Sequence, residues 1–269
     1  MSQKPAISVL MPVYNENPAF LKSAIKSILA QSFKDFELII LDDNSNNESV
    51  KKIIRDFTTK DPRVCFVRNK TNKGLAKTLN KGLAKARAQY IARLDSDDLA
   101  RKDRLKVQYA FMKKNPNCVL CGSWAVLINE KGKKIGEKKF YSDYQSIKKN
   151  ILKFNFFTHS SWFFKKSIIQ RLGGYSSKAP LNEDYDLLLK LIPKHRVENL
   201  PWFLCSYRVN KKSLTQKQNK LAQQYSIQTR IRALKEYAYP KSQYLFVIRA
   251  ILIYKFVPRF IKNIFSKTF

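Results

Sequence analysis

Acidic side chains are scarce in this chain, yet eight of them gather in three short clusters. The 269 residues include 52 Lys and Arg against 20 Asp and Glu. The clusters are Asp42 with Asp43, then Asp95, Asp97 and Asp98, and finally Glu183, Asp184 and Asp186. Each cluster lies beside an apolar segment. Neighbouring carboxylates repel one another, so this arrangement is costly unless a cation neutralises the charge.

Helix capping explains only part of these clusters. Asp is favoured at helix N-termini, and each cluster precedes an expected helix. One Asp per helix satisfies that need, which leaves the second and third carboxylates unexplained. All-oxygen ligand groups suit Mg²⁺ or Mn²⁺, which usually bridge to substrate phosphates. We therefore interpret the clusters as metal- and phosphate-handling residues, with Asp186 excepted, because its position in the first helical turn favours a structural role.

The elements expected around the clusters should bring two of them together. The first half of the chain alternates apolar strand patterns with amphipathic helix patterns. Strands are expected at Ile7–Val13, 36–41, 63–67 and 90–94, and helices at 17–32, 47–59 and 74–88. This order predicts a parallel sheet covered by helices. Ligands bind at the carboxyl ends of such strands, so the first two clusters should share one edge of the sheet.

The regular alternation of strand and helix patterns ends at about residue 115. Shorter, aromatic-rich segments follow, with a helix near 184–192. The segments are 118–128 (CVLCGSWAVLI), 154–164 (FNFFTHSSWFF) and 201–209 (PWFLCSYRV). They predict mixed or antiparallel strands added to the parallel half. From about residue 214 the pattern is helical, first polar and then apolar and basic.

The glycines and cysteines limit the kinds of phosphate-binding, metal and redox site that the chain can form. The chain has seven glycines and neither a Walker-type loop nor G-x-G-x-x-G, so phosphate has to be held by a metal and side chains. This weighs against a P-loop enzyme or a dinucleotide dehydrogenase. The four cysteines suggest a reducing compartment. Cys118 and Cys121 lie in an apolar strand-like run, which favours buried structural thiols over a metal or redox site.

Five segments together resemble the family 2 glycosyltransferases with the GT-A fold. They are ISVLMPVYNE, FELIILDDNSNNES, NKGLAKTLNKGL, YIARLDSDDLARKDRL and LNEDYDLLLKL, and they occur in the family's order over about residues 6–210. The resemblance implies an α/β, Rossmann-like fold with a mixed central sheet, to which the helical pattern from about residue 214 adds a helical C-terminal extension. It also implies an inverting transferase that moves a sugar from a UDP-sugar to an acceptor hydroxyl.

The same resemblance implies an organisation of the chain. A catalytic domain is expected over residues 1–213, with a nucleotide-sugar half at about 1–115 and an acceptor half at about 116–213. Residues 214–269 form the basic helical extension.

On the donor side, the resemblance implies roles for residues of the first four motifs. Pro12, Val13 and Tyr14 would line the base pocket. Asp43 would read the uracil edge, with Asp42 as its neighbour, and Lys73 would contact the donor. In the D-x-D motif Asp95–Ser96–Asp97, Asp97 would ligate Mn²⁺ or Mg²⁺, and Asp95 would contact the ribose or a metal-bound water.

On the acceptor side, Asp184 matches the catalytic base. Glu183 would raise the proton affinity of Asp184 or hold the acceptor. His159 and Arg208 lie where the family often has acceptor or diphosphate contacts, although for His159 a plain polar role among aromatic residues is an equal alternative. A single displacement needs one such base to take the proton of the acceptor hydroxyl.

The positive charge points to anionic partners. The formal net charge is +32, and residues 207–269 hold 14 basic residues and one acid. Within 244–269, Lys255, Arg259 and Lys262 lie on one side of an ideal helix. The apolar surface would come from Phe246, Val247, Leu252, Phe256, Phe260, Ile261 and Phe265. Basic amphipathic segments of this kind are typical of anionic bilayer surfaces, and packing against the catalytic domain or another protomer is the alternative.

These features predict a cytoplasmic enzyme held peripherally at the inner face of the cytoplasmic membrane. No stretch approaches 18 consecutive apolar residues, so no spanning helix is expected. The acceptor would be a glycan or a lipid-linked molecule in polysaccharide or lipopolysaccharide biosynthesis.

Two other classes of protein compete with this interpretation. A nucleic-acid-binding protein would account for the basic surface, but three acidic clusters would repel phosphate, and no recognised nucleic-acid module is present. A nucleotidyltransferase would normally show a Gly-rich loop near the N-terminus. We therefore expect an enzyme and no nucleic-acid partner.

Overall fold

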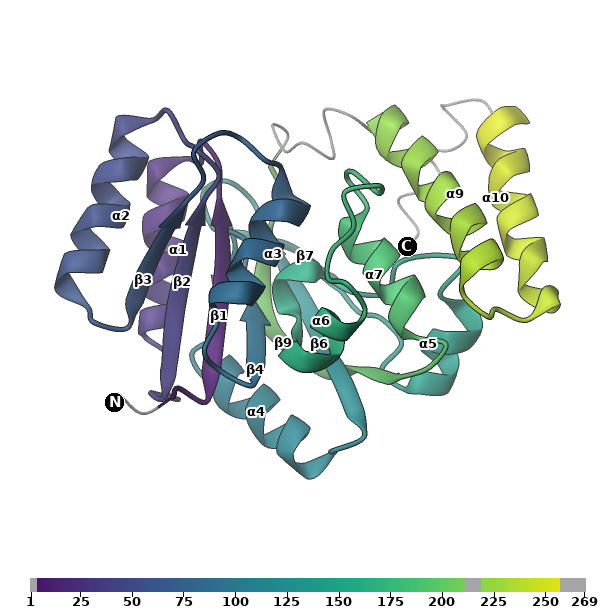
Figure 1. Cartoon of the computed structure of the whole chain (residues 1–269), viewed down its shortest axis with the longest axis horizontal. Coiled ribbons are helices and arrows are strands. Elements are labelled where there is room, and N and C mark those ends of the chain that lie inside the picture. Colours follow the sequence, from purple (N-terminus) through teal and green to yellow (C-terminus); the bar gives the residue numbers. More distant parts are fainter. Residues whose placement is uncertain (1–3, 211–218, 257–269) are drawn as a thin grey trace.

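A mixed β-sheet with helices on both faces forms the body of the molecule (Figure 1). The computed structural model describes residues 4–210 and 219–256. Within them the strands are β1 (Ile7–Val13), β2 (Phe36–Asp42), β3 (Val64–Arg68), β4 (Tyr90–Arg93), β5 (Leu99–Ala100), β6 (Cys118–Ile128), β7 (Lys134–Lys138), β8 (Phe163–Lys165) and β9 (Arg196–Arg208). Their order is β3-β2-β1-β4-β8-β6-β9-β5, and β7 pairs with β6 on the edge opposite β9.

The helices follow the alternation that the sequence predicts in the first half. They are α1 (Pro18–Leu29), α2 (Glu48–Lys60), α3 (Leu75–Lys85), α4 (Arg104–Lys114), α5 (Tyr144–Asn150), α6 (Lys166–Arg171), α7 (Glu183–Leu191), α9 (Asn219–Glu236) and α10 (Tyr244–Phe256). The Asn17 side chain caps α1 by accepting from the amide of Ala19 at 2.9 Å, and Pro18 occupies the first turn. The predicted start of this helix is confirmed.

The parallel half of the sheet is confirmed as well. β1 pairs in parallel with β2 and β4, and β2 pairs in parallel with β3. Alternating residues of each strand face opposite cores. Ile7, Val9 and Met11 pack in the core that includes α1 and α2, whereas Leu10 and Leu41 belong to the core that includes α3. Burial on both faces explains the continuous apolar runs.

The second half adds strands of both directions. β8 runs antiparallel to β4 and β6, and β9 runs parallel to β6 and antiparallel to β5. The predicted α/β class with a mixed central sheet is therefore confirmed.

The aromatic segment 154–164 differs from its predicted strand. Only Phe163 and Phe164 belong to β8, and His159–Ser161 form a 3-10 turn. The physical reason is the run of hydroxyl side chains: Ser161 donates from its hydroxyl to the Thr158 carbonyl at 2.7 Å, and its amide bonds the same oxygen at 2.8 Å. Local side-chain hydrogen bonds of this kind compete with strand pairing.

The C-terminal helices α9 and α10 lie beside α7 and α5 at one end of the molecule (Figure 1). Arg232 of α9 forms an ion pair with the buried Asp186 of α7, which retains its place in the first turn of that helix. The Tyr239 hydroxyl donates to the Leu189 carbonyl at 2.9 Å. Helical structure in the extension is thus confirmed, and the domain boundary near residue 213 stays a prediction.

Two smaller expectations concern membrane spans and thiols. Of the helices that the structure describes, none combines the length and apolarity needed to cross a membrane. Cys118 and Cys121 are buried and free, as expected for structural thiols.

Candidate active site

The first two acidic clusters meet at the carboxyl ends of β1, β2 and β4, as the parallel order predicts. Val13 pairs with Asp42 in the sheet, and the amide of Asp43 donates to the Val13 carbonyl at 2.9 Å. The chain leaves β1 and β2 through Asn15 and Asn44, both with positive φ. Asn tolerates this left-handed conformation better than most residues, which permits both sharp exits.

Asp42 and Asp43 hold the loops of this edge in place. The buried Asp42 accepts from the amide of Ser45 at 2.9 Å. Asp43 accepts from the amides of Lys73 and Gly74, both at 2.8 Å, and from the Asn69 side chain at 2.7 Å. Gly74 has a φ of 81°, which favours glycine. Asp43 therefore fixes the turn that leads into α3.

The residues predicted to line the base pocket lie at the same edge. Pro12 and Val13 are buried, whereas the Tyr14 side chain is 50% exposed and presents an aromatic face. The exposed Lys73 contributes its amide to Asp43, as described above. The uracil-reading role of Asp43 and the donor contacts of Pro12, Val13, Tyr14 and Lys73 stay predictions.

A buried guanidinium supports the D-x-D motif. Arg93 ends β4 with 2% of its side chain exposed, and it forms a bidentate ion pair with Asp95. The Ser160 hydroxyl lies 2.9 Å from an Arg93 nitrogen and donates to Asp95 at 3.0 Å. Burial opposes the charge on Arg93, but Asp95 raises its pKa above the ordinary value. Asp95 is thereby held in one orientation.

Asp97 and Asp98 fit a divalent cation. One carboxylate oxygen from each of Asp95, Asp97 and Asp98 lies within 4.8 Å of the others. Asp98 accepts from the amide of Arg208 at 2.7 Å, and its second oxygen is buried without a hydrogen-bond partner. Burial raises the pKa of Asp97 and of Asp98, and the neighbouring carboxylates raise it further. A bound cation would remove this strain between like charges.

Glu16 is a site residue that the sequence interpretation missed. It follows β1, and its carboxylate accepts from the Ser96 hydroxyl at 3.3 Å. Burial raises the pKa of Glu16, and Asp95 contributes to the shift. Its place in the motif PVYNE, directly after the first strand, is the signal that could have revealed it. The sequence interpretation also placed Asp98 in the second acidic cluster but named Asp97 alone as the ligand of the metal ion.

The third cluster faces the same centre from the first turn of α7. The Asn155 side chain donates to Asp184 at 3.0 Å. Burial raises the pKa of Asp184, and it raises the pKa of Glu183 to about 7, with Asp184 as a second cause. Arg93, which is ion-paired with Asp95, also lowers the pKa of both α7 acids, so one guanidinium influences both carboxylate groups.

His159 and Arg208 are held by protein groups. A His159 ring nitrogen lies 3.0 Å from the Tyr175 hydroxyl, and burial lowers the pKa of this imidazole well below its usual value. Arg208 donates from its guanidinium to the carbonyl oxygens of Asp97, Asn129 and Glu130. These contacts connect the D-x-D loop to the β6–β7 turn. The acceptor or diphosphate contacts of both side chains stay predictions.

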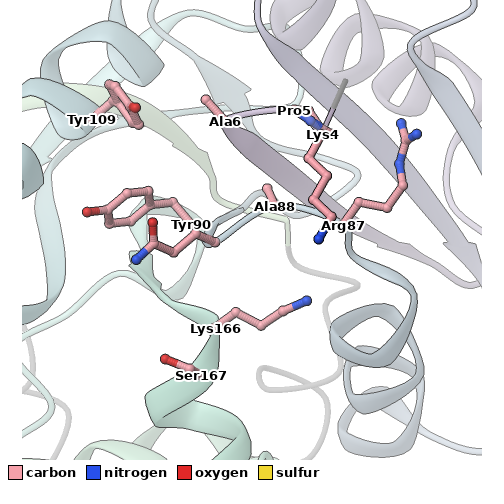
Figure 2. Close-up of a pocket in the computed structure, with 10 residues that line it drawn as sticks. Lys4, Pro5, Ala6, Arg87, Ala88, Tyr90, Tyr109, Lys166 and Ser167 are labelled. Carbon is pink, nitrogen blue, oxygen red and sulfur yellow. The ribbon is translucent and has the colours of Figure 1, made fainter. Parts of the chain in front are cut away.

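A cavity of about 480 Å³ lies away from this centre (Figure 2). Lys4, Arg87 and Lys166 surround it together with Tyr90 and Tyr109. Lys4 precedes β1 and Tyr90 begins β4, so the cavity lies at the amino ends of these strands. The acidic clusters lie at the opposite ends, and the cavity is therefore separate from the candidate active site.

Comparison with protein families relates the chain to glycosyltransferases. The model of Glycosyl transferase family 2 matches residues 8–173. An uncharacterized glycosyltransferase of Methanocaldococcus jannaschii is 34% identical over 270 residues, which covers 97% of this chain and 92% of that protein. The O-antigen biosynthesis glycosyltransferase WbnJ of Escherichia coli is 36% identical over 214 residues, covering 78% and 82% respectively.

Solved structures share the fold at low sequence identity. The mannosyltransferase PcManGT of Pyrobaculum calidifontis, in complex with GDP-Man and Mn²⁺, aligns with a TM-score of 0.70 at 18% identity, covering 95% of this chain and 71% of that one. TarS 1–349 of S. aureus, in complex with UDP, aligns with a TM-score of 0.68 at 16% identity, covering 95% and 73%.

The pKa of Glu183 leads to a prediction about stability and pH. A carboxyl whose pKa rises from 4.5 to about 7 on folding destabilises the folded state once the pH is high enough to ionise it. Glu183→Gln should therefore stabilise the fold at pH 8 by about 2–3 kcal/mol, and most of this gain should vanish at pH 5. Denaturant unfolding at both pH values measures the difference. An equal effect at pH 5 and pH 8 would contradict a buried, ionised Glu183.

Proposed function

The chain belongs to glycosyl transferase family 2, and we propose that it moves a sugar from a UDP-sugar to the hydroxyl of a glycan or lipid-linked acceptor, with inversion at the anomeric carbon. The glycosyltransferase activity and the GT-A fold follow from the family match and the structural likeness. The observation that carries the finer proposal is that the buried Arg93 forms an ion pair with Asp95 of the D-x-D motif and also lowers the pKa of Glu183 and Asp184.

The two carboxylate groups suit two different tasks in one displacement. A divalent ion held by Asp97 and Asp98 would offset the charge that develops on the leaving diphosphate. Asp184 takes the proton of the acceptor hydroxyl as its oxygen attacks the anomeric carbon. The new C–O bond forms while the bond to the phosphate oxygen breaks, and the electron pair leaves with the diphosphate. Direct attack of this kind inverts the anomeric configuration.

The environment of Asp184 fits the role of a general base. Burial raises the pKa of this carboxyl, and a carboxylate with a higher pKa accepts a proton more readily. The Asn155 side chain donates to one of its oxygens at 3.0 Å, which helps to fix the orientation of the carboxylate. Glu183 lies beside it at the start of α7 and would hold the acceptor or tune Asp184.

The proposed donor and the setting have support from related proteins. The structural neighbours carry GDP-Man in one case and UDP in another, so the fold accommodates nucleotides of this class. Asp43 matches the uracil-reading position of the family, which favours UDP here. The similarity to an O-antigen biosynthesis enzyme supports a role in surface polysaccharide synthesis.

We also propose that the C-terminal helices hold the enzyme at an anionic membrane. Along α10, four exposed apolar side chains follow helical spacing: Leu245, Ile248, Leu252 and Phe256. Leu245 is 67% and Phe256 is 75% exposed. Val247 and Phe246 pack against the core instead, which corrects their predicted place on the membrane-facing surface.

The positive charge of residues 207–269 favours an anionic bilayer as the surface that contacts the four exposed apolar side chains of α10. Residues 207–269 carry 14 basic residues and one acid, which would attract acidic headgroups. Arg259, Phe260, Ile261, Lys262 and Phe265 lie outside the described residues, as does the side chain of Lys255. Their predicted contacts with lipid stay predictions.

Removing the proposed metal ligand should abolish transfer. Asp97→Ala deletes one of the three carboxylates whose oxygens lie within 4.8 Å of one another. Because this carboxylate is the proposed metal ligand, the Mn²⁺-dependent part of UDP affinity should disappear as well. Titration of UDP with and without Mn²⁺ measures this effect. Asp103→Ala is the matched control, because Asp103 is half-exposed and paired with Arg101. Near wild-type turnover of Asp97→Ala with an unchanged metal response would rule out the assignment.

Removing the proposed base should reduce sugar transfer while donor binding is retained. Asp184→Asn keeps the shape of the side chain but cannot accept the hydroxyl proton, so transfer should fall by about 10²-fold or more while donor binding stays nearly normal. Single-turnover transfer and UDP binding measure the two quantities. Glu236→Gln, at an exposed acid of α9, should change neither. A proportional loss of binding and transfer in Asp184→Asn would instead indicate a binding or folding role.

Weakening the apolar stripe should release the enzyme from membranes. Leu252→Gln with Phe256→Gln should abolish co-sedimentation with anionic vesicles, while transfer to a short soluble acceptor is retained. Binding of the wild type should fall as salt rises, because its electrostatic part is screened. Ile135→Gln with Trp202→Gln is the control, since both side chains are about half exposed on other elements. Unchanged sedimentation of the α10 variant would refute the membrane proposal.

A further inference from the structure

Lys138, the last residue of β7, lies on the sheet face that carries part of the acidic cluster. It pairs with Ala125 of β6, Ala125 pairs with Cys205 of β9, and Cys205 pairs with Ala100 of β5. Directly paired residues lie on the same face of a sheet. Asp98 precedes Ala100 by two residues, so the row that begins at Lys138 ends beside the D-x-D motif.

The ammonium group of Lys138 contacts an aromatic ring rather than a carboxylate. It lies 4.1 Å from the centroid of the Tyr207 ring, and Tyr207 follows Cys205 by two residues on the same face. Among the residues that the structure describes, no acid lies within ion-pair distance of Lys138, and no acceptor takes a hydrogen bond from it. The next residue, Lys139, differs, because it pairs with Glu137 at 2.9 Å.

The charges around Lys138 locate it within the site. Burial lowers the pKa of Lys138, whereas Asp98, and to a smaller extent Asp184, raise it. These acids belong to the proposed metal group and to the α7 turn. The larger influence of Asp98 agrees with the strand pairing, which leads from Lys138 toward the D-x-D motif. A partly desolvated ammonium with three unused donors suits an anionic ligand.

We propose that Lys138 binds the β-phosphate of the donor nucleotide. This inference rests on the proposed function, since it takes the donor to be a nucleoside diphosphate sugar. In a single displacement the diphosphate and the attacking hydroxyl lie on opposite sides of the anomeric carbon. The metal group marks the diphosphate side and Asp184 marks the hydroxyl side. Lys138 belongs to the first of these, and it would remain protonated while the breaking bond leaves its electron pair on the phosphate oxygen.

The test compares two nucleotides that differ only in the β-phosphate. Lys138→Met keeps a long, unbranched side chain at this position but removes the charge. With Mn²⁺ present, it should weaken UDP binding by about 10- to 100-fold, the usual scale for a charge-assisted hydrogen bond, and change UMP binding by less than about twofold. Lys138→Arg, which keeps a cation, should preserve more of the UDP preference than Lys138→Met. Lys139→Met should leave both affinities unchanged.

Each outcome separates this inference from the proposed function. If Lys138→Met binds UDP like the wild type, or loses UDP and UMP equally, the β-phosphate contact is wrong. A raised KM for the acceptor with unchanged UDP affinity would place Lys138 on the acceptor instead. If the wild type itself does not bind UDP, the proposed donor fails, and the comparison of GDP with GMP then tests Lys138 independently. Circular dichroism and the Tm of each variant confirm that it is folded.

Discussion

The burial of one cation, Arg93, beneath a group of acids is the constraint on which the site depends. Carboxylates taken out of water need positive charge or hydrogen bonds close by, since burial alone drives them to the neutral form. Arg93 supplies that charge at the end of β4, where it pairs with Asp95 and also lowers the pKa of Glu183 and Asp184. Removing one partner of such a buried pair is strongly destabilising, because the other charge remains in the interior.

A second buried arginine, Arg104, holds in place the strand that carries Arg93. Arg104 of α4 donates to the Arg93 carbonyl at 2.7 Å and to the Trp162 carbonyl at 3.1 Å. It therefore ties β4 to the segment that enters β8. β9 completes this frame, because the amide of Arg208 bonds Asp98 and its side chain bonds the Asp97 carbonyl. The D-x-D loop is thus held from the parallel half and from the mixed half together.

The parallel half and its acidic edge were predictable from the sequence because their signals are local. Buried parallel strands are continuously apolar, and Asn17 marks the start of α1 without reference to any distant residue. The hydrogen bonds of Arg208 to the D-x-D loop and the place of Lys138 depend instead on pairings between strands far apart in the chain, such as β6 with β9. A sequence pattern does not encode that register. The strand predicted over 154–164 failed for the opposite reason, since local hydroxyl contacts outweighed its aromatic composition.

The ion pair between Asp186 and Arg232 has a consequence for the order in which the protein is completed during synthesis. The parallel half can pair its strands once about the first hundred residues have emerged, because β1 to β4 all lie between Ile7 and Arg93. Helix α7 follows, but the counter-charge of its buried Asp186 arrives 46 residues later, on α9. A nascent chain therefore completes the carboxyl edge of the parallel strands well before the helix that carries Glu183 and Asp184 receives its counter-charge. The last part of the active site to become firm is the helix that carries its proposed base.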